Sequence, residues 1–143
     1  MDSSLTHRPC FLVVDREYSG SISTRKLVIE TAKFNVLTAY SAGEALDTIR
    51  RFPAIDGIVM DAEMPEMPCP ELVQTIKQIN PAVPVVIVHR PLSEPCTGAD
   101  HQLDTFDPKQ LLNLLQSLCP EHTEAVEKQN EMLKAEEKEK DRS

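Results

Sequence analysis

The chain has 143 residues, 27% of them charged and 41% hydrophobic, and a formal net charge of −8 at pH 7. This is ordinary usage for one globular domain with a moderate core. The negative charge argues against non-specific nucleic-acid binding, which needs a basic surface. Because no apolar run approaches the roughly 20 residues of a membrane helix and the N-terminus has no signal-peptide pattern, we expect a cytoplasmic protein that binds neither nucleic acid nor membrane.

The cysteines are widely spaced and include no C-x-x-C pair. They are Cys10, Cys69, Cys96 and Cys119. In a reducing compartment their simplest interpretation is four free thiols, and a disulfide framework is not expected at this density. An alternative is a zinc site formed by Cys69 and Cys96 with His89 and His101, but the spacing of these residues differs from that of known zinc ribbons.

The first part of the chain alternates strand and helix patterns. The run CFLVV, residues 10–14, is continuously apolar, which is typical of a strand buried on both faces. A helical pattern follows at 21–33, with Ser21 or Ser23 as its N-cap. Residues 35–40, NVLTAY, form a more mixed strand pattern, which suits the edge of a sheet.

The middle of the chain repeats this alternation. Residues 42–52 have apolar side chains at helical spacing, and the apolar run IDGIVM then leads directly to Asp61. A further helical pattern covers 70–79, where Pro70 suits the first turn. The run VPVVIV, residues 83–88, has the composition of another buried strand.

The last part of the pattern contains a weak strand at 101–103 and a Leu-rich helix, for which Asp107 is the expected N-cap and Pro108 the first residue. Only the stretch RPLSEPCTGADHQL separates the ends of the last two strands. A crossover helix of about 11 residues would not fit there with its loops, and the two prolines oppose it. We therefore expect the fourth helix to be shortened or absent.

Strands that alternate with helices predict an α/β fold with a doubly wound parallel sheet. In such sheets, functional groups gather where the strands reach their carboxyl ends. Several polar side chains occupy these positions, and we take them as the candidate site. They are Asp15, Arg16, Asp61, His89, Arg90 and Asp104.

The order of these segments and the residues in them resemble the receiver domain of two-component response regulators. The resemblance rests on FLVVDREYS, NVLTAYSAGEAL, IDGIVMDAEMPEM and FDPKQLLNLL, and the D-x-x-M-P segment after a strand is its most specific part. It implies the flavodoxin-like strand order 2-1-3-4-5 for a receiver domain at 9–119. An N-terminal extension (1–8) would precede this domain, and a charged tail (120–143), helical or disordered, would follow it.

The resemblance also implies a function. Asp61 would accept a phosphoryl group from a histidine kinase or a phosphotransfer protein in a phosphorelay, which makes the chain a signalling domain rather than an ordinary enzyme. Mg²⁺ would be held by Asp15, Asp61 and the backbone carbonyl of Glu63. Output would be contact with another signalling protein, and a homodimer is left open.

Three positions depart from the family pattern. Arg16 stands where a second metal-binding acid is usual, His89 replaces a hydroxyl residue, and Asp104 replaces a lysine. We expect Arg16 to repel Mg²⁺ and to pair with Asp61, Asp104 or both, the alternative being that it points to solvent. A hydrogen bond between His89 and Asp104 is one interpretation of these two positions, the alternative being a surface histidine with no role. These departures leave a second function open, that of a phosphorylation-independent pseudo-receiver that binds proteins.

Overall fold

The structure is a computed structural model that describes residues 8–16, 24–104, 107–122, 128–129 and 131–133. The predicted caps Ser21 and Ser23 and most of the predicted tail lie outside these residues. The helices and strands of the domain are β1 (Cys10–Val14), α1 (Thr24–Thr31), β2 (Asn35–Ala39), α2 (Ala42–Arg51), β3 (Gly57–Asp61), α3 (Cys69–Ile79), β4 (Val85–Val88), β5 (His101–Leu103) and α4 (Pro108–Leu118).

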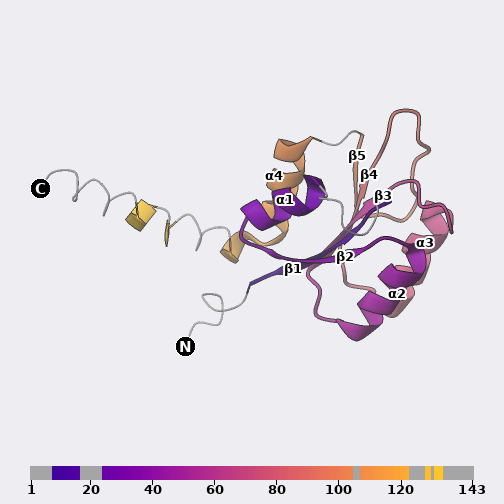
Figure 1. The fold of residues 1–143 in the computed structure, drawn as a ribbon, viewed down its shortest axis with the longest axis horizontal. Coiled ribbons are helices and arrows are strands. Elements are labelled where there is room, and N and C mark those ends of the chain that lie inside the picture. Colours follow the sequence, from indigo (N-terminus) through magenta and orange to yellow (C-terminus); the bar gives the residue numbers. More distant parts are fainter. Residues whose placement is uncertain (1–7, 17–23, 105–106, 123–127, 130, 134–143) are drawn as a thin grey trace, which may run out of the picture.

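The five strands form one sheet in the order β2-β1-β3-β4-β5, and every neighbouring pair is parallel (Figure 1). This confirms the predicted α/β fold class and the strand order. It also confirms that β2 lies at an edge, with a half-buried pattern that differs from the full burial of β3 and β4. Because the strands are parallel, all their carboxyl ends meet at one edge of the sheet.

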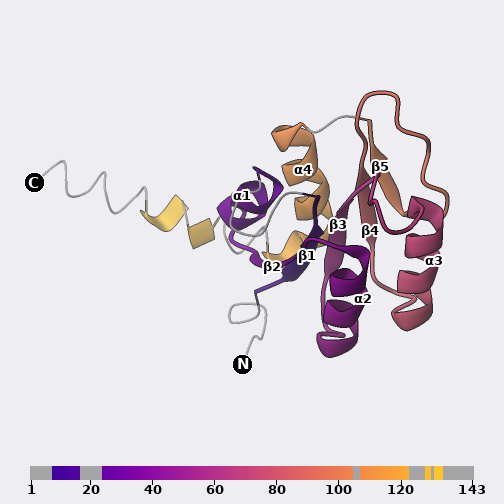
Figure 2. The same ribbon diagram turned by 45° about the vertical axis from the view of Figure 1, so that its right-hand side comes forward.

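Helices cover both faces of the sheet. Figures 1 and 2 show α1 and α4 together on one face and α2 and α3 together on the other. Successive side chains of a strand point to opposite faces, so each strand contributes to two cores. One core joins Leu12, Ile58 and Ile87 to α2 and α3, and the other joins Val13, Val59 and Val86 to α1 and α4.

Two helices begin where the sequence provides an N-terminal cap. At α4 the Asp107 side chain accepts from the backbone N–H of Lys109 at 2.9 Å, and Pro108 occupies the first turn, as predicted. At α2 the Ser41 hydroxyl accepts from Glu44 N at 3.0 Å, while the Glu44 carboxylate accepts from the backbone N–H of the residue before the cap at 2.7 Å. These paired contacts satisfy N–H groups that the helix itself leaves without partners.

The crossover between β4 and β5, residues 89–100, is described throughout and contains no helix, which confirms the expectation of a shortened or absent fourth helix. Its end is anchored by Asp100, whose Oδ2 accepts from Val85 N at 2.8 Å and from Lys77 Nζ at 2.7 Å. The short segment therefore passes from β4 to β5 as an irregular loop.

The prediction of four free thiols is wrong for two of them. Cys69 and Cys96 form a disulfide, with Cα atoms 5.6 Å apart and 27 positions between them in sequence. Cys10 and Cys119 form no disulfide, as predicted. The spacing gave no indication of the pair because the fold alone brings the start of α3 against the crossover.

Among the helices that the structure describes, none is long and apolar enough to cross a membrane. The described residues of the predicted tail, 120–122, 128–129 and 131–133, are helical. The boundaries proposed at residues 8 and 120 stay predictions.

Candidate functional site

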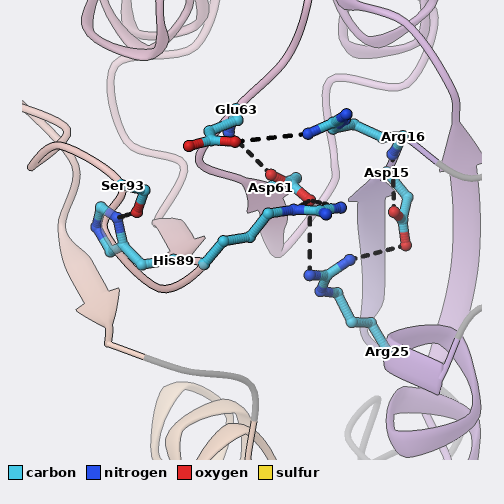
Figure 3. A network of polar contacts seen from close by, with 8 residues as sticks. Asp15, Arg16, Arg25, Asp61, Glu63, His89 and Ser93 are labelled. Atoms are coloured by element: carbon cyan, nitrogen blue, oxygen red, sulfur yellow. Dashed lines mark hydrogen bonds and ion pairs between the residues drawn. The ribbon is translucent and has the colours of Figure 1, made fainter.

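Two buried carboxylates lie side by side at the carboxyl edge of the sheet. Asp61 is the last residue of β3 and 0% exposed, and Asp15 follows β1 and is 2% exposed. The central strands β1 and β3 are paired to each other, so their carboxyl ends place both acids in the middle of this edge (Figure 3). Burying two ionised carboxylates is costly unless positive charge and hydrogen bonds compensate.

Guanidiniums face the Asp61 carboxylate. Its Oδ2 lies 3.2 Å from Arg90 Nε and 3.0 Å from Arg90 Nη2, and 3.7 Å from Arg25 Nη2. Its Oδ1 accepts from the backbone N–H of Glu63 at 2.8 Å. Both oxygens of Asp61 therefore already have hydrogen-bond donors, and two guanidiniums lie beside Oδ2.

Arg25 bridges the two acids. Its Nη1 donates to Asp15 Oδ2 at 2.9 Å, its Nη2 faces Asp61, and its side chain is only 12% exposed. The other Asp15 oxygen accepts from Arg16 N at 2.7 Å. Arg25 was not among the residues predicted for the site. The sequence could have indicated it, because a cation near the N-terminus of a helix is unfavourable unless a carboxylate lies nearby.

Arg90 reaches the site from the loop that follows β4, and 44% of its side chain is exposed. The hydrogen bond and the charge of Asp61 raise the pKa of Arg90, so its guanidinium stays charged. Arg90 was predicted to lie at this edge, but no role was predicted for it. Its exposure makes it the more movable of the two cations at Asp61.

The predicted pairing of Arg16 with Asp61 or Asp104 is wrong. Arg16 Nη1 lies 3.5 Å from Glu63 Oε2, with the two side chains 40% and 48% exposed. An exposed pair of this kind contributes about 1 kcal/mol or less. Asp104 is exposed and forms no ion pair with any residue that the structure describes. Arg25, from α1, supplies the contact that the sequence had suggested for Arg16.

The predicted hydrogen bond between His89 and Asp104 is also wrong. The His89 ring is 9% exposed, with Nδ1 2.7 Å from Ser93 Oγ and Nε2 2.7 Å from Gln102 Oε1. An amide oxygen only accepts, so Nε2 carries a proton. Figure 3 shows the ring turned toward Ser93 and away from Asp61. His89 therefore organises the crossover rather than the carboxylate pair.

The residues at this edge do not fit Mg²⁺. This ion needs oxygen ligands in near-octahedral geometry. Here guanidiniums face Oδ2 of both acids, and the two Oδ1 atoms accept from backbone N–H groups. Three carboxylates are matched by three guanidiniums, so the formal charge of the cluster is zero without a metal. The cluster consists of Asp15, Asp61, Glu63, Arg16, Arg25 and Arg90. Within the part of the chain that the structure describes, no group of three or more His, Cys, Asp or Glu side chains could hold a metal ion.

Known proteins share this fold and part of this sequence. The transcriptional regulatory proteins GlrR of Escherichia coli K12 and QseF of Escherichia coli O157:H7 are each 28% identical over 102 residues, which is 71% of this chain and 23% of those proteins. The chain thus spans about a quarter of the length of these curated relatives. Among solved structures, the chemotaxis response regulator CheY4 of Vibrio cholerae is 27% identical, with a TM-score of 0.64 over 78% of this chain and 99% of that one.

Two further solved structures match in fold. A response regulator receiver domain protein from Clostridium thermocellum has a TM-score of 0.66 at 23% identity and covers 87% of this chain and 98% of that one. A chain of the CheX-CheY-BeF3-Mg complex from Borrelia burgdorferi has a TM-score of 0.63 at 23% identity and covers 77% of this chain and 88% of that one. The family described as response regulator receiver domain matches residues 11–116. The chain therefore belongs to the receiver domains of two-component response regulators, which are signalling domains.

Proposed function

We propose that this receiver domain acts as a protein-binding module whose site is fixed by Arg25 and Arg90, independently of phosphorylation at Asp61. The observation that carries the proposal is the fully buried Asp61 Oδ2, which faces guanidinium nitrogens at 3.0, 3.2 and 3.7 Å. In this arrangement the positive charge that phosphoryl transfer needs is already committed to the unmodified carboxylate.

Transfer to Asp61 would need an exposed carboxylate oxygen, in-line approach of a donor, and cations on the oxygens of the transferred group. Asp61 is 0% exposed, so a donor would reach it only after Arg90 had moved. Moving Arg90 would leave the acid with one cation fewer in a buried setting, which is unfavourable. The two guanidiniums therefore stabilise the unmodified Asp61 carboxylate and do not favour its phosphorylation.

A second function, phosphoacceptance by Asp61, is favoured by one observation. The acid ends β3 beside Asp15, and the side chain that covers it, Arg90, is 44% exposed and can swing toward solvent. After transfer, the guanidiniums of Arg25 and Arg90 would bind the phosphoryl oxygens through charge-assisted hydrogen bonds. The donor would be a histidine kinase or a phosphotransfer protein, and no step would run through Mg²⁺.

Under either function we propose that output is contact with another signalling protein in the cytoplasm. The solved complex of CheX with CheY contains a similar fold in contact with such a partner. The net charge of −8 supports a protein partner over nucleic acid. A homodimer stays open as a further form of this contact.

The test is an intact-mass measurement after incubation with acetyl phosphate, with and without Mg²⁺. A typical receiver domain is treated in parallel as the positive control. If the chain acts as a protein-binding module independently of phosphorylation, it should gain no phosphoryl group under conditions that label the control. An adduct that Asp61→Asn abolishes would instead establish phosphoacceptance, and its independence of Mg²⁺ would identify the guanidiniums as the cations used.

A calorimetric titration with Mg²⁺ gives a second, independent measurement. We expect no saturable heat in the wild-type protein, because guanidiniums face Oδ2 of Asp15 and of Asp61. The double variant Arg25→Met/Arg90→Met removes both of them and should gain affinity if its fold, checked by circular dichroism, is kept. Mg²⁺ affinity of the wild type equal to that of the control receiver would contradict the proposed role of the two arginines.

A further inference from the structure

The Cys69–Cys96 disulfide joins the two segments that flank the Asp61 site. Cys69 is the first residue of α3 and ends the loop that begins directly after Asp61. Cys96 lies in the crossover 89–100, which carries Arg90 to the site. The cross-link therefore connects the segment that presents the carboxylate to the segment that presents the cation covering it.

Cys96 is also connected to the start of the crossover by hydrogen bonds. Its N–H donates to Gln102 Oε1 at 3.0 Å, and its carbonyl accepts from Gln102 Nε2 at 2.9 Å. The same Gln102 oxygen accepts from His89 Nε2 at 2.7 Å. His89 is adjacent to Arg90 in sequence, so the position of Cys96 is linked through one side chain to the residue beside the cation.

The crossover has little regular backbone structure to hold it in place. It contains no helix. Within residues 89–100, all of which the structure describes, the one backbone hydrogen bond runs from Ser93 N to Arg90 O at 3.1 Å. Leu92 is fully exposed and has a positive φ of 67°. Segments with few buried contacts and few backbone hydrogen bonds open locally at low cost, so the disulfide is the strongest restraint on this loop.

We propose that the Cys69–Cys96 pair is a redox site that exchanges with a dithiol reductant and thereby sets the mobility of the crossover and of Arg90. In the cytoplasm proposed above, which is a reducing compartment, disulfides are mostly redox-sensing or catalytic, and Cys10 and Cys119 form no disulfide in the same fold. The inference concerns the crossover and holds whether or not Asp61 is phosphorylated.

The exchange proceeds in two balanced steps. A thiolate of the reductant attacks Sγ of Cys69, which is the more exposed residue (Cys69 is 8% and Cys96 0% exposed). A mixed disulfide forms, and Cys96 leaves as a thiolate that takes a proton. The second thiolate of the reductant then attacks its own mixed-disulfide sulfur and releases Cys69, which is protonated in turn. Two electrons and two protons pass to the protein, and the reductant leaves as a disulfide.

The first experiment counts thiols. Protein prepared without reductant and alkylated in denaturant should label at two cysteines, Cys10 and Cys119, and at four after treatment with dithiothreitol. Re-oxidation with glutathione disulfide should restore two. Labelling at all four positions after this oxidation would overturn the proposal, because the pair would then not cross-link in the folded chain.

The second experiment measures hydrogen exchange in the oxidised and reduced proteins. Peptides covering 89–100 should exchange at least about tenfold faster after reduction, while α2 (Ala42–Arg51) is unchanged. The variant Cys96→Ser should match the reduced protein with or without dithiothreitol, and Cys10→Ser/Cys119→Ser should still respond as the wild type does. If Cys96→Ser does not fold, the reduced wild type provides the same comparison.

Two outcomes of this experiment would count against a redox site. Unchanged exchange of 89–100 on reduction would mean that the disulfide does not restrain the crossover. Equal acceleration of α2 would mean that reduction unfolds the whole domain, so that the disulfide is a structural cross-link and not a local switch.

Discussion

Replacing Arg25 by Met removes the guanidinium that bridges Asp15 and Asp61 and keeps a long, unbranched side chain. In the wild type, Arg25 nitrogens lie 2.9 Å from Asp15 Oδ2 and 3.7 Å from Asp61 Oδ2, and the two acids are 2% and 0% exposed. Removing one partner of a buried ion pair costs about 3–5 kcal/mol. Because Asp61 keeps Arg90, we expect the lower end, a loss of about 3 kcal/mol in the free energy of unfolding at pH 7.

Urea denaturation followed by circular dichroism measures this loss. With an m value of about 2 kcal/mol/M, the midpoint should fall by about 1.5 M. The matched control is Arg51→Met, which removes the same group from an exposed pair with Asp47 at 3.3 Å, where the side chains are 72% and 59% exposed. That variant should change the free energy of unfolding by no more than about 0.5 kcal/mol.

A double-mutant cycle separates the ion pair from the packing of the Arg25 stem. If the loss comes from removing the cation beside Asp15, Arg25→Met/Asp15→Asn should be less destabilised than the sum of the single variants, by about 1 kcal/mol or more. Additive losses, or an Arg25→Met variant no less stable than Arg51→Met, would refute the assignment of Arg25 as the bridge.

Three other predictions concern the rest of the domain. Gly57→Ala should destabilise by about 1–3 kcal/mol in the same denaturation assay, because the added Cβ would lie 2.6 Å from Phe11 Cε1. Burial works to raise the pKa of Asp100, but the hydrogen bond and charge of Lys77 and a backbone N–H outweigh it and lower the pKa below 3.8. The stabilisation is therefore present above this value and lost as the pH falls through the folded pKa, so Asp100→Asn should cost about 1 kcal/mol at pH 6 and less at about pH 3. Burial, followed by a nearby carboxylate, raises the pKa of Cys119 from 9.0 to about 11, so its alkylation at pH 8 should be about 100-fold slower than that of an unperturbed thiol, measured by mass spectrometry.

Each of these predictions has a built-in comparison. Gly43→Ala adds a Cβ whose nearest neighbour is the Ser41 hydroxyl at 4.0 Å, so an equal loss there would show that the Gly57 effect is not steric. If the loss in the free energy of unfolding on Asp100→Asn is the same at pH 6 and at about pH 3, the ionised carboxylate is not its cause. If Cys119 is alkylated as fast in the native protein as in urea, the prediction that burial slows its reaction is wrong.

The apolar patterns predicted the core because burial on both sheet faces requires them locally. VVIV and GIVMD are continuously apolar and are fully buried strands, whereas the mixed NVLTA is the edge strand. The Asp107-Pro108 pair predicted the start of α4 for an equally local reason, since a cap and its helix turn are adjacent in sequence. The two prolines and the shortness of the stretch after β4 predicted the missing helix in the same way.

The partners within the site were not predictable from such patterns. Arg16 is next to Asp15 in sequence, yet its side chain pairs with Glu63, while Arg25, ten positions away, bridges the buried acids. Arg25 lies in the first turn of α1 (Thr24–Thr31) and Arg16 in the segment after β1, so the inward position of Arg25 depends on how that helix packs on the sheet. The pairing of His89 with Gln102 depends likewise on the parallel register of β4 and β5.

By itself, the sequence determined the α/β architecture, the strand that ends on Asp61 and the edge of the sheet where polar groups gather, because these follow from periodicity and from parallel pairing. Only the tertiary structure decided that Arg25 and Arg90 cover Asp61 and that Cys69 is bonded to Cys96. Those contacts join residues 27 to 36 positions apart, and a distance of a few ångströms between such residues is fixed by the packing of whole elements, which no local pattern encodes.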